Sequence, residues 1–205
     1  MVLKRQILII RGGEAFEKEE DYLEYIRTEK LDPYENTKNW RDWIIWALSE
    51  THDVLVPLMP CKQKAEYKSW KIWFERHFEF LQDENPSVIG HSLGATFLLK
   101  YLSENNFPRK IKQLHLIAPA TTNEPPLYLE RLATFKFDLS KINAITKNCE
   151  EVHVWYSEDD DLIPQENFQI ARQYLPDAIF HVFTNRGHFR QPAFMELLQS
   201  IQNVK

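Results

Sequence analysis

Short apolar runs of strand length alternate along this chain with segments of helical spacing, and this alternation restricts the fold more than any other feature. Each parallel crossover needs about a dozen residues or more, which the helical segments supply. The pattern predicts an α/β fold with a mostly parallel sheet of about six strands and helices on both faces. The predicted strands are Gln6–Ile10, Asp53–Pro57, Ser87–Ile89, Gln113–Ile117, Val152–Tyr156 and Ala178–Phe183. The predicted helices are Asn39–Ser49, Ala65–Leu81, Ala95–Glu104, Gln165–Tyr174 and Pro192–Gln202.

The chain has 205 residues, which is enough for one sizeable core, and no repeat or linker divides it. We therefore expect a single domain over residues 1–205. Two stretches break the alternation: the acidic, polar Glu14–Lys38 and the stretch Pro119–Asn148, which begins with several prolines. These are interpreted as loop-and-helix excursions near the functional site, forming only a minimal cap.

Net charge and cysteine usage limit the classes of partner. The formal net charge is −5, and no run of Lys and Arg offers a local basic patch, so neither nucleic acid nor an anionic membrane surface is expected as a partner. No apolar stretch approaches the 18 or so residues that cross a bilayer. Cys61 and Cys149 stand alone, which favours neither a disulfide framework nor a metal site and fits a reducing cytoplasm.

The sequence Gly90-His91-Ser92-Leu93-Gly94 lies between a β-rich run and a helical segment. A serine at a sharp strand-to-helix turn projects its hydroxyl clear of the sheet, and the crowded turn demands small flanking residues. A chance match to this pattern in the chain has a probability of roughly half a percent, even before the flanking elements are required. Ser92 is therefore the predicted nucleophile.

A nucleophilic serine acting on a carbonyl needs donors for the oxyanion that develops. The helix that begins near Leu93 offers free backbone N–H groups and a positive end, so the Leu93 N–H is the first predicted donor. A second donor is expected from the loop after the first strand, where Arg11-Gly12-Gly13-Glu14 follows at once. Gly13 is the predicted donor there, with a plain two-glycine turn as the alternative.

A serine hydroxyl also needs a base to take its proton. Of seven histidines, His188 is best placed, because it follows the last predicted strand and precedes the last helix. The others lie within predicted strands or helices, at the amino end of a strand, or beside the nucleophile: His115, His153, His181, His77, His52 and His91.

The group that orients the base is expected after the strand ending at Tyr156. Three adjacent carboxylates follow it, Asp159, Asp160 and Asp161, and spacing alone leaves all three open. A calcium loop is disfavoured, because acidic residues at alternate positions, a glycine and a later glutamate are not found in register. A solvated acidic turn accounts for the two that do not orient the base.

These motifs resemble the α/β-hydrolase superfamily and, within it, the small, nearly capless serine hydrolases of the retinoblastoma-binding protein 9 type. The likeness covers most of the chain and rests on the elbow Gly90–Gly94, Asp53–Pro57 with its preceding helix, Ser157–Pro164 and Gly187-His188-Phe189. In that family the acid lies four residues before the proline, which selects Asp160. The order Ser92, Asp160, His188 is also the superfamily's order of nucleophile, acid and base.

Two departures from the family are visible. The loop after the first strand is longer and acidic, with Arg11 where many such hydrolases have histidine. The retinoblastoma-pocket signature Leu-x-Cys-x-Glu is absent; the nearest segment is Met59-Pro60-Cys61-Lys62-Gln63. A pocket-protein partner is therefore not assumed, and the sequence leaves any protein partner open.

The sequence thus predicts a serine hydrolase of carboxylesterase type that cleaves an ester, or an amide, of a small acyl substrate through an acyl-enzyme without a cofactor. Two alternatives stay open. One is a partner-binding protein on a hydrolase scaffold with little or no activity. The other is a different reaction of the same triad, such as carbon–carbon bond hydrolysis or perhydrolysis.

Overall fold

A computed structural model describes residues 4–31, 33, 39–121 and 129–203 of the chain. Its centre is a six-stranded sheet in the order β2-β1-β3-β4-β5-β6, in which every neighbouring pair is parallel. The strands are β1 (Arg5–Ile10), β2 (His52–Leu55), β3 (Ser87–His91), β4 (Ile111–Ile117), β5 (Cys149–Ser157) and β6 (Ile179–Phe183). The predicted α/β fold is confirmed.

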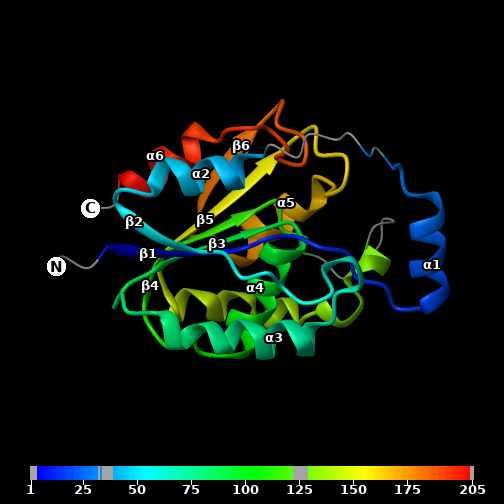
Figure 1. Ribbon diagram of the computed structural model, residues 1–205, viewed down its shortest axis with the longest axis horizontal. Helices are drawn as coiled ribbons and strands as arrows, with labels where there is room; N and C mark the ends of the chain where they lie inside the picture. The colour runs from blue at the N-terminus through cyan, green and yellow to red at the C-terminus, as the bar shows by residue number, and fades with distance from the viewer. Residues whose placement is uncertain (1–3, 32, 34–38, 122–128, 204–205) are drawn as a thin grey trace.

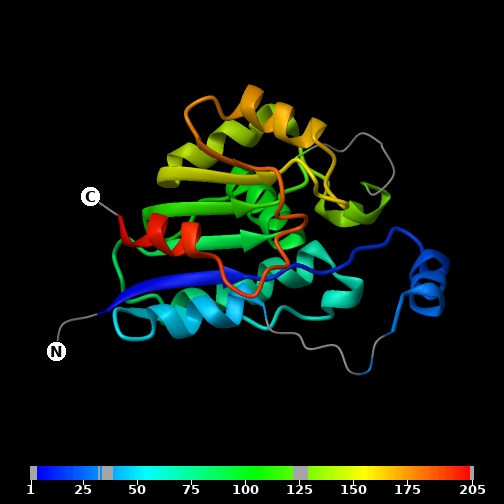
Figure 2. The ribbon, with the colours of Figure 1, turned by 90° about the horizontal axis from the view of Figure 1, so that it is seen from above.

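Helices cover both faces of the sheet (Figures 1 and 2). One face packs against α2 (Trp40–Leu48) and α6 (Met195–Gln202), and the other against α3 (Tyr67–Arg76), α4 (Leu93–Glu104) and α5 (Glu166–Tyr174). Two layers of core result, one on each side of the strands.

β1 shows why a continuous apolar run is required in the middle of such a sheet. Ile7 and Ile9 point into the core beneath α2 and α6, whereas Leu8 and Ile10 point into the core beneath α3 and α4. All four side chains are fully buried. Successive side chains of a strand face opposite sides, so a strand buried on both faces cannot alternate with polar residues.

The strand order reverses between β1 and β3. The chain moves from β1 outward to β2 and then returns to the other side of β1 to form β3. Loops that leave the carboxyl ends of β1 and β3 therefore diverge and leave a crevice, which is where ligands bind in open parallel sheets. The predicted nucleophile loop and the predicted oxyanion loop are these two loops.

Most elements begin or end a few residues from the predicted bounds, and two of these differences have clear physical reasons. β2 ends at Leu55 rather than Pro57, because proline has no N–H to donate to a neighbouring strand. The predicted helix Ala65–Leu81 is instead α3 followed by a tighter 3₁₀ turn, His77–Phe80. The His77 ring bonds the Trp73 carbonyl at 2.8 Å, so a side chain takes up one of the last carbonyls of the helix.

Both excursions contain helix, as predicted. The first holds α1 (Glu19–Thr28), which has no buried residue and stands beyond the end of the strands, apart from the sheet (Figures 1 and 2). Rings of Tyr22 and Tyr25 pack on Phe16 and join it to the body. In the second, the described residues form two 3₁₀ segments, Leu129–Phe135 and Leu139–Lys147. None of the helices in the described ranges combines the length and apolar character that a bilayer crossing requires.

Three histidines lie side by side on neighbouring strands. His115 on β4 stacks on His153 of β5 at 4.5 Å between ring centroids, and His153 stacks on His181 of β6 at 5.4 Å. Burial lowers the pKa of each of them, with mutual repulsion adding to the effect for His115 and His181, and the pKa of His181 falls to about 4. Within the described part of the chain, only His153 of the three histidines has a neighbouring carboxylate, Glu151, that partly offsets the lowering of its pKa. The stack is therefore a set of neutral imidazoles.

We expect the stack to make the fold acid-sensitive. The pKa values are lower in the folded than in the unfolded chain, so the unfolded chain binds more protons, and stability present above pH 6.5 is lost as pH falls from about 6.5 toward 4. Urea denaturation across this range should give a steeper loss for wild type than for His181→Phe, which keeps a ring against Trp155. His77→Phe, outside the stack, should retain the wild-type slope, and equal slopes for all three proteins would contradict the assignment.

Candidate active site

Ser92 occupies a strained turn between β3 and α4. Its backbone angles are φ 56° and ψ −128°, a region that L-residues rarely adopt. The Ser92 N–H donates to the Ile117 carbonyl at the end of β4, 2.9 Å away, and the Ser92 carbonyl accepts from Ala95 and Thr96. Bonds on both sides of the residue thus hold the strained conformation in place.

The two motif glycines are required by close approaches of the backbone. A Cβ on Gly90 would lie 2.6 Å from Ala95 Cα, and one on Gly94 would lie 2.3 Å from the Ile10 carbonyl oxygen. The second contact shows that the start of α4 is pressed against the end of β1. A larger residue at either position would push the helix, and Ser92 with it, away from the sheet.

His188 is held by Asp160. The His188 Nδ1 atom lies 3.0 Å from Asp160 Oδ2 and 3.1 Å from Oδ1, and both side chains are almost completely buried, with exposed fractions of 6% and 0%. A carboxylate only accepts, so the proton sits on Nδ1, and Nε2 carries the lone pair. Nε2 is buried and has no hydrogen-bond partner among the described residues. This imidazole is oriented to take a proton at Nε2.

The three adjacent carboxylates do different things. Asp160 Oδ1 also accepts the Leu162 and Ile163 N–H groups at 2.9 Å, which fixes the carboxylate facing His188. Asp159 accepts from Ser157 Oγ and from the Gly187 N–H, and these bonds lower its pKa. Asp161 pairs with Arg190 at the surface, at 3.1 Å. Only Asp160 of the three contacts the histidine.

His91 is a supporting residue that the sequence reasoning set aside. Arg41 can only donate, so its Nη1, 3.1 Å away, makes His91 Nδ1 an acceptor. His91 Nε2–H then donates to the His188 carbonyl at 3.0 Å. Burial, with His188 and Arg41 nearby, lowers the His91 pKa well below its usual range, so the ring stays neutral. His91 thus fixes the backbone of His188.

The loop after β1 lies directly against Ser92. A Cβ on Gly12 would be 3.0 Å from Ser92 Cβ, and one on Gly13 would be 2.4 Å from the Lys62 carbonyl oxygen. Glu14 anchors the loop to the segment after β2 through two backbone bonds of 2.7 Å. As the first residue of α4, Leu93 has no intrahelical acceptor for its N–H. Leu93 follows Ser92 directly in the chain, and Gly12, rather than the predicted donor Gly13, makes the close approach to the Ser92 side chain.

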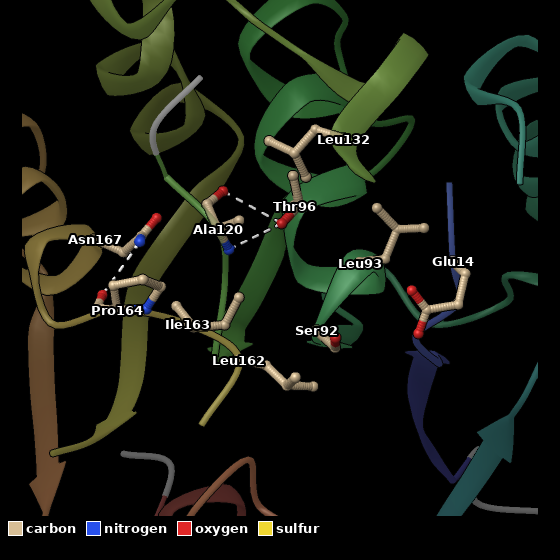
Figure 3. Close-up of a pocket in the computed structure, with 11 residues that line it drawn as sticks. Glu14, Ser92, Leu93, Thr96, Ala120, Leu132, Leu162, Ile163, Pro164 and Asn167 are labelled. Atoms are coloured by element: carbon tan, nitrogen blue, oxygen red, sulfur yellow. Dashed lines mark hydrogen bonds between the residues drawn. The ribbon is translucent and has the colours of Figure 1, made fainter. Parts of the chain in front are cut away.

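Two hollows meet at Ser92. A small one of about 70 Å³ is lined mainly by apolar side chains and is drawn in Figure 3. A larger one of about 580 Å³ is lined by Ser92, His188 and several charged residues. Within the described ranges, no three His, Cys, Asp or Glu side chains are grouped so as to hold a metal ion.

Comparison with known proteins identifies the family of the chain. A family model described as serine hydrolase matches residues 34–203. The chain belongs to the serine hydrolase family. This hydrolase is 27% identical over 170 residues to the serine hydrolase RBBP9 of Rattus norvegicus, a match that covers 82% of the chain and 87% of the relative.

Solved structures share the fold of this serine hydrolase. The ydeN gene product from B. subtilis superposes with a TM-score of 0.74 at 19% identity, covering 98% of both chains. A thioesterase domain from the curacin biosynthetic pathway gives 0.66 at 14% identity, covering 97% of this chain and 91% of its own. Carboxylesterase CesB from Bacillus subtilis gives 0.62 at 13% identity, covering 98% and 83%. At these identities the likeness establishes the fold alone.

We expect two glycines of the site to respond differently to alanine. Gly94→Ala sets a methyl group against a backbone oxygen and should cost about 3 kcal/mol of stability. Gly187→Ala meets no atom within 4 Å and strains only a φ of +50°, so it should cost about 1 kcal/mol. Urea denaturation of both variants measures the difference, and equal losses would show that the α4–β1 contact is not tight.

Proposed function

We propose that this hydrolase cleaves an ester, or an amide, of a small acyl substrate through a Ser92–His188–Asp160 triad and an acyl-enzyme. The observation that carries the proposal is the orientation of His188. Asp160 engages Nδ1, and the buried Nε2 is left without a partner in the hollow that Ser92 also lines. An unpaired buried nitrogen is costly and is retained where a proton must move.

The mechanism follows from the chemistry of these groups. Ser92 Oγ attacks the acyl carbon as His188 Nε2 takes its proton, and Asp160 stabilises the imidazolium that forms. The backbone N–H groups of Leu93 and Gly13 are the proposed oxyanion donors, the first of them at the positive end of α4. His188 then gives the proton to the leaving atom, and water, activated by the same base, releases the acid.

The relatives support an acyl substrate in general terms. Neighbours of the same fold include a thioesterase domain and a carboxylesterase, both named for acyl transfer to water. The small hollow beside Ser92 is lined by Leu93, Ala120, Leu132 and Ile163, and its size fits an acyl group of a few carbon atoms (Figure 3).

A fluorophosphonate probe tests the nucleophile and the base together. The adduct should form on Ser92, disappear in Ser92→Ala, and form at least about 10³-fold more slowly in His188→Ala, because the hydroxyl is no longer deprotonated. Mass spectrometry locates the adduct, and Ser69→Ala, an exposed serine on α3, is the matched control. A folded wild type that takes no label would instead favour the partner-binding alternative.

The acid can be assigned by amide substitutions at adjacent positions. Asp160→Asn should lower kcat for an ester by about 10⁴-fold, because an amide no longer favours the Nδ1–H tautomer or stabilises the imidazolium. Asp161→Asn, which removes only a surface ion pair, should stay within about twofold. Steady-state kinetics of the two variants decides the matter: comparable activity in both would remove Asp160 from the triad.

A further inference from the structure

The two hollows that meet at Ser92 have different chemical character. Leu93, Leu132 and Ile163 contribute apolar surface to the smaller one, seen in Figure 3. The larger one is lined by arginines together with other polar groups. A substrate that reacts at Ser92 must therefore have one apolar part and one polar part.

His188 determines which part of the substrate occupies which hollow; this step rests on the proposed function. The leaving atom receives its proton from His188 Nε2, so the leaving group must lie on the side of the histidine. His188 lines the larger hollow and is absent from the lining of the smaller one. The acyl group is thus assigned to the apolar hollow and the leaving group to the charged one.

Three arginines line the larger hollow, and two of them are already paired. Arg11 forms an ion pair with Asp42 at 2.8 Å, and Arg190 forms one with Asp161 at 3.1 Å. Arg41 has no carboxylate within 4.0 Å in the described part of the chain.

Arg41 is a half-buried cation with spare donors. Its Nη1 bonds His91 Nδ1, and its guanidinium lies 5.6 Å from the centre of the Trp40 ring. A guanidinium carries five N–H donors in a planar fork, and one of them serves His91. Burial and the neighbouring Arg11 lower the pKa of Arg41, and the nearby Asp42 opposes this shift without cancelling it.

The other charged side chains around the larger hollow do not neutralise the charge of Arg41. Asp42 is bonded on one oxygen by Arg11 and on the other by Asn39 Nδ2 at 2.9 Å. Lys62 adds a further cation at the exposed rim, and Glu14 lines both hollows together with Ser92. The Arg11 Nε atom, also in this hollow, is buried without a partner among the described residues.

We propose that the preferred substrates of this enzyme carry a carboxylate on the leaving group, and that Arg41 binds it. The planar fork of Arg41 matches the two oxygens of a carboxylate. One half-buried cation without an ion-pair partner among the described residues matches a monoanion better than a dianionic phosphate. Arg41 is separated from the His188 carbonyl by the His91 ring, so the carboxylate lies several bonds from the leaving atom.

The reaction balances without any further reactant. The bond from Ser92 Oγ to the acyl carbon forms as the bond from that carbon to the leaving oxygen breaks. The proton taken from Ser92 passes through His188 to that oxygen, which releases a hydroxy acid as its carboxylate. Water then cleaves the acyl-enzyme and yields a short carboxylic acid.

A pair of esters tests the carboxylate site. The butyrate ester of 3-hydroxybenzoate carries the charge, and the butyrate ester of methyl 3-hydroxybenzoate is its neutral counterpart. We expect wild type to favour the charged ester by about tenfold or more in kcat/KM, and Arg41→Gln to remove that preference, chiefly through KM. Arg109→Gln, an exposed arginine before β4 at the opposite end of the sheet, should keep the wild-type ratio.

The ratio of kcat/KM for the charged ester to kcat/KM for the neutral ester separates two roles of Arg41, binding of the carboxylate and positioning of His91. If Arg41→Gln lowers the activity on both esters by the same factor, Arg41 acts only through His91, and the carboxylate site is wrong. Equal use of both esters by wild type, or a stronger preference for a phosphate on the leaving group, would also overturn it. In those cases hydrolysis of the neutral ester still supports the proposed function, which fails only if neither ester is cleaved and the fluorophosphonate does not label Ser92.

Discussion

The contact between the start of α4 and the end of β1 is the constraint on which the rest of the site depends. Gly94 lies so close to the Ile10 carbonyl that no side chain fits between the two backbones. The same contact places the turn at Ser92 over the point where the strand order reverses. Main-chain packing therefore brings together Ser92, the N-terminus of α4 and the Gly12-Gly13 loop.

Around that fixed turn, the buried polar groups form one connected arrangement. Asp160 holds the His188 ring, while His91 holds the His188 backbone and is itself fixed by Arg41. Each bond in this series has an unambiguous donor, because Arg41 can only donate and Asp160 only accepts. The tautomers of both histidines follow, and they leave one nitrogen, His188 Nε2, unpartnered in the described structure.

The sequence was most informative where the physical requirement is local. Buried parallel strands must be apolar on both faces, so β1 is visible as an uninterrupted run, and a turn as tight as Gly90–Gly94 demands glycine at fixed spacing. Spacing alone left Asp159, Asp160 and Asp161 equivalent, because only the fold decides which carboxylate meets the histidine. His91 was missed for the same reason: its partners Arg41 and His188 lie 50 and 97 residues away along the chain. The residues that shape the hollows come largely from loops, whose paths depend on contacts that no periodicity encodes.

The bonds made by Asp159 have a mechanical consequence. Through Ser157 Oγ and the Gly187 N–H, this residue ties the loop after β5, which carries Asp160, to the loop after β6, which carries His188. Asp160 and His188 are thereby carried by two loops that are bonded to each other. The His91 bond to the His188 carbonyl adds a further anchor, from the end of β3 beside Ser92. A displacement of the loop after β6 would therefore have to break bonds to the loop after β5 and to the end of β3, and loss of any one of these bonds leaves the others holding His188 in place.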